Sequence, residues 1–365
     1  MRFTAPVKPL LAALAPCAKI APASASIPIL GNVLIEAGDG IAFVGNDLDK
    51  TMRAETAAVV SAAGRTTAAA HLLLDILRKL NPEADVAFEQ DDKGLVIRSG
   101  RARFTLQTLN PDDFPVFDEA AFPHVFTLPA SAFAAMFADV AHAISTEETR
   151  YYLNGVFLHA APPTSLRMVA TDGHRLARRD YPLPDGAAGI PGMIVPRAAC
   201  VEMARLAGAY SGDARISASS NRLRAAFGPV TLTTKLVDGT FPDYMRVIPH
   251  HEMALTLDRE ALARAVDRVS VIASERGRAV KFSIADAAVA LSTTSPDAGS
   301  ANEEIESDWR AAPIEIGFNA RYLLEALATL VGDRAAFDLG DPNAPAILRD
   351  PARSDLLIVL MPLRV

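Results

Sequence analysis

The sequence is poor in cysteine and lacks long apolar runs. Its 365 residues include two cysteines, Cys17 and Cys200, which lie too far apart in sequence to indicate a disulfide framework or a Cys-x-x-Cys zinc site. No apolar stretch approaches the roughly 18 residues that a membrane-spanning helix needs. The first residues do not combine a basic segment with an apolar core, so we expect no signal peptide and a cytoplasmic protein.

Several motifs of catalytic and nucleotide-binding proteins are also missing. The chain has no Gly-x-x-x-x-Gly-Lys-Ser/Thr loop, no glycine-rich turn of the dinucleotide-binding type and no Gly-x-Ser-x-Gly elbow. The formal net charge of -7 argues against a protein that coats itself with nucleic acid nonspecifically. It still permits one basic face on an acidic molecule.

One pattern occurs three times along the chain. In each copy a strand residue is followed by large apolar residues seven and eleven places later: Phe3, Leu10 and Leu14; Phe126, Phe133 and Phe137; Leu255, Leu262 and Val266. In the middle copy the apolar residues step by three and four, which is typical of one buried stripe on a helix: Phe133, Met136, Phe137, Val140, Ala141 and Ile144. We interpret the pattern as a triplication.

The remaining segments predict the same order in each copy: strand, helix, strands, second helix, strands. Second helices are expected at 68–80, 197–209 and 320–330, the last with Asn319 as its N-cap. Strands are expected at 29–37, 41–44, 47–54, 94–98, 101–108, 155–160, 166–171, 214–218, 222–227, 230–235, 279–284, 288–293, 335–339, 346–348 and 356–361. This order indicates an α+β fold with two helices on an antiparallel sheet in each of three domains, at 1–122, 123–250 and 251–365.

The densest polar cluster is Ala-Thr-Asp-Gly-His-Arg-Leu-Ala-Arg-Arg at 170–179. Asp172 and His174 could bind a metal or form an acid–base pair. A turn at Gly173, in which both side chains bond nearby backbone, is favoured because no second cluster completes a catalytic site.

Two further charged features each have two interpretations. Arg150, Tyr151 and Tyr152 suit a nucleic-acid backbone with stacked bases, but equally a half-buried tyrosine pair beside a solvated arginine. Opposite charges gather in two runs, at Arg98, Arg101 and Arg103, and at Glu303, Glu304, Glu306 and Asp308. These runs are either two solvated surfaces or a head-to-tail contact between chains.

Seven segments in this order resemble the bacterial sliding clamp, the beta subunit of DNA polymerase III, over the full chain. They are I-P-I-L-G-N (27–32), R-Y-Y-L-N-G (150–155), A-T-D-G-H-R-L-A (170–177), K-L-V-D-G-T-F-P-D-Y (235–244), R-V-I-P (246–249), G-F-N (317–319) and M-P-L-R-V (361–365). The resemblance implies a head-to-tail homodimer that forms a closed ring around duplex DNA without reading its sequence. It implies no catalytic activity and no cofactor. The partners it implies are the replicative polymerase, the clamp loader and repair proteins, which bind through short peptides.

The resemblance also implies three sets of functional residues. A peptide groove would comprise Leu153, Thr171, Gly173, His174, Arg175, Leu176, Pro242, Arg246, Val247, Asn319, Tyr322, Val359, Leu360, Met361, Pro362, Leu363 and Arg364. DNA-facing residues would be Arg78, Lys79, Arg150, Tyr151, Tyr152, Arg197, Arg205, Arg264 and Arg268. The dimer contact would use Arg98, Arg101, Arg103, Phe104, Leu106, Val271, Ile272, Glu303 and Glu304.

The sequence departs from the family at three places. Gly277 stands where some relatives carry an aromatic residue over the groove, and Ser24 where a DNA-contacting arginine is expected. The segment 126–144 holds no lysine or arginine, so we expect the positive field to come from Arg150 and the other helices. Two alternatives stay open: a metal-dependent hydrolase, and a clamp-shaped scaffold that binds peptides but does not encircle DNA. The sequence also leaves open whether this is the main clamp or a second copy.

Overall fold

A computed structural model describes residues 1–365 except 25, 118–120, 162, 252, 274–278 and 365. The described chain forms two compact units. The first contains Met1–Phe133, Asp185–Ile190 and Arg205–Leu236, and the second contains Ala134–Pro184, Pro191–Ala204 and Val237–Val365. Among the described residues, no helix is both long enough and apolar enough to cross a membrane.

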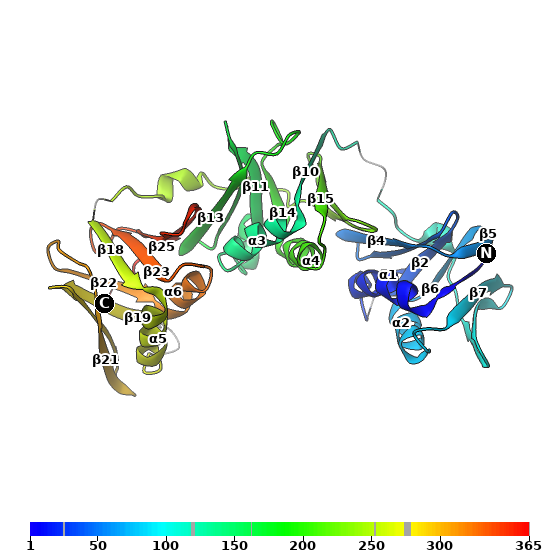
Figure 1. Ribbon diagram of the computed structural model, residues 1–365, viewed down its shortest axis with the longest axis horizontal. Helices are drawn as coiled ribbons and strands as arrows, with labels where there is room; N and C mark the ends of the chain where they lie inside the picture. The colour runs from blue at the N-terminus through cyan, green and yellow to red at the C-terminus, as the bar shows by residue number, and fades with distance from the viewer. Residues whose placement is uncertain (25, 118–120, 162, 252, 274–278, 365) are drawn as a thin grey trace. The chain divides into compact units, whose positions relative to one another are not determined.

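The three repeats share one order of helices and strands, apart from one additional strand, β5, in the first, and Figure 1 labels many of these elements. The first consists of β1 (Arg2–Pro6), α1 (Val7–Ile20), η1 (Pro28–Gly31), β2 (Asn32–Ala37), β3 (Ile41–Asn46), β4 (Lys50–Thr56), β5 (Val59–Ala62), β6 (Gly64–Ala69), α2 (Ala70–Lys79), β7 (Asp85–Asp91), β8 (Gly94–Ser99), β9 (Ala102–Leu106) and η2 (Pro111–Asp113).

The second repeat consists of β10 (His124–Pro129), α3 (Ala130–Ala141), η3 (Glu148–Leu153), β11 (Gly155–Ala161), β12 (Ser165–Thr171), β13 (Arg175–Pro182), β14 (Met193–Pro196), α4 (Arg197–Gly208), β15 (Asp213–Ala218), β16 (Arg222–Phe227), β17 (Val230–Lys235) and η4 (Tyr244–Val247). The third consists of β18 (Met253–Asp258), α5 (Arg259–Ser270), β19 (Ala279–Ala285), β20 (Ala288–Ser295), β21 (Gly299–Glu306), β22 (Ile314–Asn319), α6 (Ala320–Leu327), β23 (Arg334–Leu339), β24 (Ala346–Asp350) and β25 (Arg353–Leu360).

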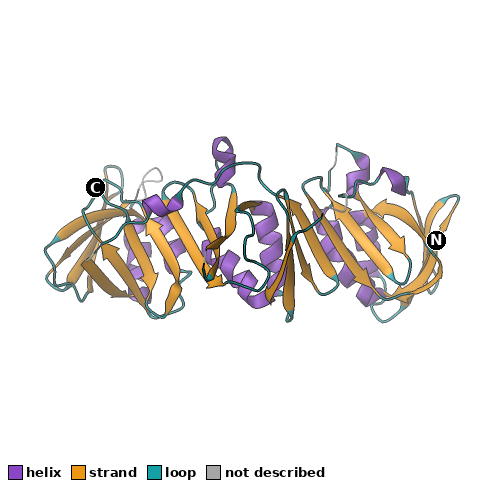
Figure 2. Cartoon of the chain, turned by 90° about the horizontal axis from the view of Figure 1, so that it is seen from above, coloured by secondary structure: helices purple, strands orange, loops and turns teal. Residues whose placement is uncertain are grey.

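The predicted triplication and the α+β class are confirmed. All nine residues of the repeated apolar pattern are buried, and Figure 2 shows the helices lying against strands. Ala141, the last residue of α3, was expected in the buried stripe of the middle helix but is exposed. Asn319 caps α6 as predicted, since its side chain accepts a hydrogen bond from the Tyr322 N–H at 3.2 Å.

Several predicted bounds were wrong, each for a local reason. Residues 29–31 belong to a 3-10 helix that begins at Pro28, because proline favours the first turn of a helix and lacks a ladder donor. Residues 47–49 form a turn before β4, in which the Asp47 carboxylate accepts two backbone N–H groups. Residues 68 and 69 complete β6 rather than open α2. The helix expected at 320–330 ends at Leu327.

Four antiparallel sheets organise the part of the chain that the structure describes. Two belong to single repeats, with the orders β5-β1-β7-β8-β9 and β21-β20-β19-β22. Two eight-stranded sheets join repeats: β10-β15-β16-β17-β4-β3-β2-β6 in the first unit and β14-β11-β12-β13-β25-β24-β23-β18 in the second. The joining pairs are β17 with β4 and β13 with β25. We call these pairs the first seam and the second seam.

Candidate functional site

The polar cluster at 170–179 forms the turn between β12 and β13. Asp172 Oδ1 accepts the backbone N–H groups of His174 and Arg175 at 2.9 and 3.0 Å. Gly173 has a φ of +88°, which a glycine adopts without the strain that a side chain would add. The predicted turn is confirmed. Its carboxylate organises the backbone, and among the described residues no three His, Cys, Asp or Glu side chains gather as metal ligands would.

The Arg175 side chain lies buried at the centre of this turn. Its Nε donates to Asp172 Oδ2 at 3.1 Å, and its Nη1 donates to Glu325 of α6. The guanidinium carbon lies 4.2 Å from the centre of the Tyr322 ring, and the His174 ring stacks on the same tyrosine at 6.3 Å between centroids. A cation over an aromatic face is attracted to the ring quadrupole. The turn of the second repeat and α6 of the third are therefore held as one surface.

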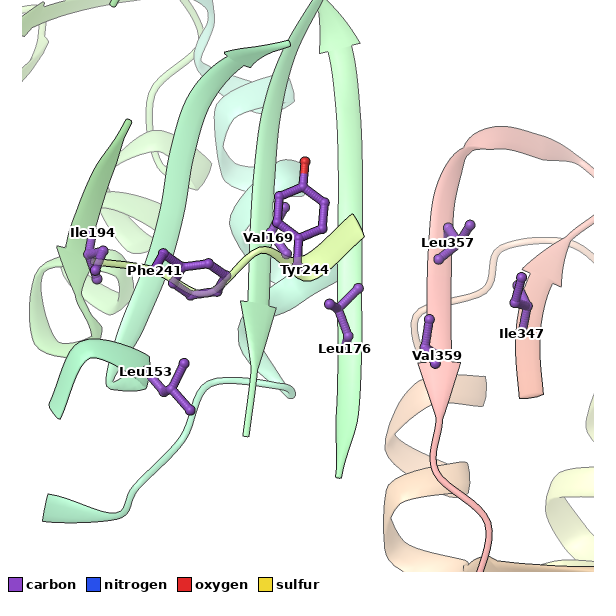
Figure 3. Close-up of a cluster of buried hydrophobic side chains, with 9 residues drawn as sticks. All are labelled: Leu153, Val169, Leu176, Ile194, Phe241, Tyr244, Ile347, Leu357 and Val359. Carbon is purple, nitrogen blue, oxygen red and sulfur yellow. The ribbon is translucent and has the colours of Figure 1, made fainter. Parts of the chain in front are cut away.

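An apolar cluster lies beside this surface (Figure 3). It gathers side chains from η3, β12, β13, β14, β24, β25 and the segment after β17: Leu153, Val169, Leu176, Ile194, Phe241, Tyr244, Ile347, Leu357 and Val359. The Phe157 and Phe241 rings stack at 4.8 Å next to it. Three residues expected in the groove, Leu153, Leu176 and Val359, are part of this buried floor.

Exposed apolar side chains flank the floor. Val247 is 47% exposed and Met361 40%, whereas most apolar residues of this region are buried. The Met361 N–H donates to the His174 carbonyl at 2.9 Å, and the Leu363 N–H donates to the Gly317 carbonyl at 2.8 Å. These two bonds fix the C-terminal segment beside the turn. An apolar surface that is exposed and also rigid is suited to binding an apolar side chain.

The structure thus brings together most of the residues expected in the groove. Hydrogen bonds and strand pairing link the turn, α6 and the C-terminal segment, and these contain Thr171, Gly173, His174, Arg175, Asn319, Tyr322, Leu360, Met361 and Leu363. Pro242, Arg246 and Val247 flank the buried Phe241 and Tyr244, while Pro362 and Arg364 adjoin Leu363. Arg246 points away into solvent, with its side chain 83% exposed and paired with Asp243.

Sequence reasoning missed the role of Glu325. It follows Tyr322 by three places on α6 and therefore shares its helix face, which is the signal that could have found it. It also missed Arg150 as a neighbour of the turn. A side chain at Gly173 would meet Arg150 Nη1 at 2.6 Å, so the arginine covers the glycine.

A polar hollow of about 370 Å³ adjoins the turn. It is lined by Ala141, His142, Ile144, Ser145, Thr146, Glu147, Asp172, His174, Arg175, Arg197, Arg321, Tyr322 and Glu325. Burial, together with the nearby positive charge of Arg175, lowers the pKa of His142 to about 4. His142 is therefore neutral at pH 7.

Tyr151 and Tyr152 each fit a different one of the two interpretations of their segment. The rings meet edge to face at 5.8 Å. Tyr152 packs against the apolar cluster, as expected for a half-buried tyrosine, whereas Tyr151 is 55% exposed. The Arg150 Nε donates to Glu147 Oε2 at 2.7 Å. Tyr151 is accordingly the ring of this pair that is accessible to a ligand.

The other basic residues expected to face DNA lie exposed on helices. Arg78 and Lys79 end α2, and Arg197 and Arg205 lie at opposite ends of α4. On α5, Arg264 pairs with Glu260 and Arg268 pairs with Glu303. In α3 the sole carboxylate, Asp139, is buried.

Asp139 is bound by two arginines at the second seam. Its Oδ2 lies 3.0 Å from Arg179 Nε and 2.6 Å from Arg353 Nη2. Asp355 pairs with both arginines in turn. The network ties α3 to β13 and β25.

The residues expected at a dimer contact lie on β8, the β8–β9 turn, β9, β21 and the segment just after α5. Leu106 is 7% exposed, Phe104 is half-buried and Val271 is 81% exposed. Arg98 pairs with Glu89, while Arg101, Arg103 and Glu304 are exposed. Ile272 is half-buried. Ser24 is exposed, and Gly277 lies outside the described residues.

Three family models of the DNA polymerase III beta subunit match successive parts of the chain. The N-terminal domain matches residues 1–118, the central domain 127–243 and the C-terminal domain 245–364. Together they cover nearly the whole sequence.

Individual relatives agree with the family models. The chain is 42% identical to the beta sliding clamp of Caulobacter vibrioides over the full length of both, and 34% identical to that of Escherichia coli K12 over 93% of each. A crystal structure of the Caulobacter crescentus beta sliding clamp superposes with a TM-score of 0.96 over both full chains. A sliding clamp from Bartonella birtlesii bound to griselimycin, 40% identical, also gives 0.96 over both full chains. The chain belongs to the DNA polymerase III beta subunit family, the beta sliding clamps.

Proposed function

We propose that two copies of this chain close head to tail into a ring, encircle duplex DNA without sequence readout, and tether the replicative polymerase to its template. The observation that carries this proposal is the strand pairing at the two seams. Both seams follow one pairing rule. The same rule leaves one strand without a partner in the first repeat and one in the third.

Each seam joins the last strand of one repeat to the third strand after the first helix of the preceding repeat. In this way β17 pairs with β4, and β25 pairs with β13. The two strands that the rule leaves over are β9 and β21, which both lie at sheet edges among the described strands. Pairing β9 of one copy with β21 of another extends the rule, and two such contacts close a dimer with no free edge there.

The internal seams also predict the register of this contact. Leu232 lies opposite Met52 in the first seam, and Ile358 lies opposite Ala177 in the second. The equivalent residues are Leu106 on β9 and Ala301 on β21, so Leu106 of one copy would lie opposite Ala301 of the other. Thr105 then lies opposite Asn302 of the second copy. Arg103 lies opposite Glu304, which gives a cross-strand pair of opposite charge.

A hollow between the end of α5 and the first turns of α6 fits the same contact. It measures about 330 Å³ and is lined by Asp267, Ser270, Val271, Ala273, Ala320, Arg321, Leu324 and Glu325. The corresponding hollow between α1 and α2 is completed by residues of the second repeat, including Val230 of β17. The counterpart of Val230 on β9 is Phe104. We assign Phe104 of the second copy to this hollow.

Partner proteins bind, in this proposal, on the surface formed by the β12–β13 turn, α6 and the C-terminal segment. The buried cluster forms its floor, exposed Val247 and Met361 flank it, and Tyr322 is held by Arg175. Such a site recognises a short peptide through apolar anchors, with a few polar groups that orient the peptide. The replicative polymerase, the clamp loader and repair proteins would compete for it.

The remaining parts of the proposal follow from this role. The three domains extend over 1–122, 123–250 and 251–365, with the seams inside the chain. The protein acts by topology rather than by catalysis, because tethering raises the effective concentration of the polymerase at the primer end. It works in the cytoplasm, on chromosomal DNA.

A loading assay tests the ring. Protein loaded onto nicked circular DNA should stay bound and should leave when the circle is cut. A clamp-shaped scaffold would show no such difference, and a strict monomer at micromolar concentration with its loader present would contradict the proposal.

Peptide binding tests the groove. Tyr322→Ala and Met361→Ala should each lower the affinity for a partner peptide by about tenfold or more, because each removes a side chain that anchors the peptide. Val331→Ala is a matched control, because Val331 is 67% exposed in the same repeat but outside the predicted set. Equal losses in all three variants would place the peptide elsewhere.

A further inference from the structure

We propose that His159 is a positioning residue of the partner-peptide site, because it accepts a hydrogen bond from Tyr244 that holds the segment 238–250 against the sheet. The inference rests on the proposed function and adds two things to it: a residue outside the predicted groove, and a loss of peptide affinity in mild acid. The residues that make this contact all lie in the second compact unit.

The segment 238–250 forms one flank of the site, where Val247 is 47% exposed. The backbone–backbone hydrogen bonds that these described residues make are local and join residues three places apart. Side chains attach the segment to the sheet instead, since Phe241, Tyr244 and Ile248 pack on the apolar cluster that forms the floor. The position of the flank therefore depends on a few side-chain contacts.

Of these three side chains, Tyr244 alone has a polar group. The residue is 7% exposed, and Figure 3 shows its hydroxyl pointing away from Leu176. Arg167 Nη1 donates to the hydroxyl oxygen at 3.0 Å, and His159 Nε2 lies 3.0 Å from the same oxygen. Because a buried hydroxyl has lost its hydration, these two contacts decide whether Tyr244 is stable in this place.

The proton positions follow from the partners. His159 Nδ1 lies 2.9 Å from the Ala160 carbonyl oxygen, and because a carbonyl only accepts, Nδ1 carries the proton of the neutral ring. Nε2 is then an acceptor, and Tyr244 donates its O–H to it. Since an arginine only donates, the hydroxyl oxygen accepts from Arg167. With a neutral ring, both ring nitrogens and the hydroxyl have partners.

A charged ring cannot keep this arrangement. Nε2 then carries a proton as well, so it no longer accepts from the Tyr244 hydroxyl and becomes a second cationic donor beside Arg167. The Tyr244 proton loses its acceptor, and a polar group buried without a partner is costly. Protonation of His159 should therefore release Tyr244 and loosen the segment 238–250.

The surroundings of His159 favour the neutral ring. The charged groups near it are Arg167, whose guanidinium pairs with Asp180, and Arg178, whose Nε lies 3.4 Å from the same carboxylate. Burial lowers the pKa of His159, and so does the charge of Arg167, while the backbone hydrogen bond and Asp180 act in the opposite sense. The ring is consequently neutral at pH 7 and takes up its proton in mild acid, below the ordinary pKa of about 6.5.

The equivalent place of the first repeat is built differently. Strand pairing gives the equivalent residues of His159, Arg167 and Asp180 as Glu36, Ala42 and Glu55. These three line a hollow of about 830 Å³, and none of the lining residues that the structure describes is aromatic. The network around the Tyr244 hydroxyl is therefore not a general feature of this sheet position. It occurs in the repeat that carries the peptide site.

Four variants of the full-length dimer test this role. Tyr244→Phe keeps the ring and removes the donated proton. His159→Ala removes the acceptor, whereas His159→Gln supplies an uncharged acceptor that does not titrate. His250→Gln is the matched control, since His250 is exposed on the same segment. The probe is a capped peptide of the replicative polymerase in which glutamine replaces the acidic and basic residues, so that the peptide itself does not titrate.

At pH 7.5, His159→Ala and Tyr244→Phe should lower peptide affinity by about three- to tenfold, the range of one hydrogen bond, while His159→Gln stays near the wild type. Between pH 7.5 and pH 5, the wild type and His250→Gln should lose at least about twofold more affinity than His159→Gln and Tyr244→Phe. Other histidines of the site, such as His174, are present in every chain and cancel in this comparison. An equal pH response in the wild type and His159→Gln would overturn the role of His159, and so would wild-type affinity in Tyr244→Phe.

A second measurement does not depend on the peptide. NMR titration of the His159 ring in the free dimer gives its pKa, which should rise in Tyr244→Phe because the neutral ring loses its donor. An unchanged pKa would mean that the hydroxyl does not stabilise the neutral ring, and it would also overturn the proposal. Absence of peptide binding to the wild-type chain at either pH would contradict the proposed site itself. Binding without the expected differences would contradict only the role of His159.

Discussion

The second seam can be compared with the open edge strand β21. Each has an ion pair between a helix and a strand at equivalent positions, but the acidic and basic residues are exchanged. Six residues after Phe133, α3 carries Asp139, which pairs with Arg179 of β13. Six residues after Leu262, α5 carries Arg268, which pairs with Glu303 of β21. The strand ladders give the same equivalence, because Arg179 lies opposite Met168 and Glu303 lies opposite Leu291.

The two pairs differ in burial. The Asp139 and Arg179 side chains are 9% and 12% exposed, and β25 covers them. The Arg268 and Glu303 side chains are 58% and 27% exposed. A buried network resists separation because parting leaves uncompensated charges in a poorly hydrated place, whereas exposed charges are rehydrated. In the proposed ring, one geometry would thus serve as a permanent joint inside the chain and as a reversible joint between chains.

The largest expected effect comes from breaking the permanent joint. Asp139→Ala leaves Arg179 and Arg353 without their shared carboxylate, which should lower the free energy of unfolding by about 3–5 kcal/mol. Urea denaturation followed by circular dichroism measures this. Asp355→Ala is the control, since Asp355 is 39% exposed and its loss should cost clearly less. Equal costs would show that burial does not distinguish the two carboxylates.

Breaking the reversible joint should act on association and leave folding unchanged. Phe104→Ala removes the side chain assigned to the hollow of the second copy, at a cost of about 2–4 kcal/mol per contact. The dimer dissociation constant should rise at least about 100-fold in analytical ultracentrifugation. A dimer as tight as the wild type would remove Phe104 from the interface.

Mild acid should destabilise the folded chain through His142. His142 lines the hollow beside the β12–β13 turn. The residue at the equivalent position of the third repeat is Val271, which is exposed. Since burial lowers the folded pKa of His142 to about 4, the unfolded chain binds more protons between pH 6.5 and 4, and stability falls as pH falls. The cost should reach about 2 kcal/mol at pH 5.

His142→Gln removes that titration. The difference in unfolding free energy between pH 7 and pH 5 should therefore be about 2 kcal/mol smaller in the variant than in the wild type. An unchanged difference would mean that folding does not lower the pKa of His142. Val271→Gln should leave this difference as it is.

The smallest expected effect concerns the exposed charges of the open edges. Arg103→Glu places like charges opposite Glu304 of the second copy and should weaken the dimer by about tenfold. Glu304→Arg in the same chain restores opposite charges and should recover most of the loss. Further weakening in the double variant would show that these residues do not face each other.

Much of this architecture could be predicted from the sequence. The buried stripes of α1, α3 and α5 repeat because each must cover its own sheet, so Phe3, Phe126 and Leu255 mark the repeats without any structure. Asn319 and the turn at Gly173 were also readable, because caps and turns depend on neighbouring residues.

The seams could not be predicted in the same way. Pairing of β17 with β4 joins residues far apart in sequence, and nothing in the local pattern of either strand selects its partner. The Asp139 network has the same difficulty, because its arginines come from β13 and β25 and a lone acid on a helix usually indicates a solvated face. Glu325 was missed for this reason as well, since its partner Arg175 lies in another repeat.

The central claim is that β9 of one copy pairs with β21 of another in the register of the internal seams. Thr105→Cys with Asn302→Cys tests it most directly, because facing residues of a hydrogen-bonded antiparallel pair have Cα atoms about 5.5 Å apart, which suits a disulfide. Mild oxidation should give a covalent dimer in denaturing electrophoresis, while Thr105→Cys with Glu304→Cys, displaced by two residues, should give little. No covalent dimer from the first pair, or faster cross-linking of the displaced pair, would contradict the account.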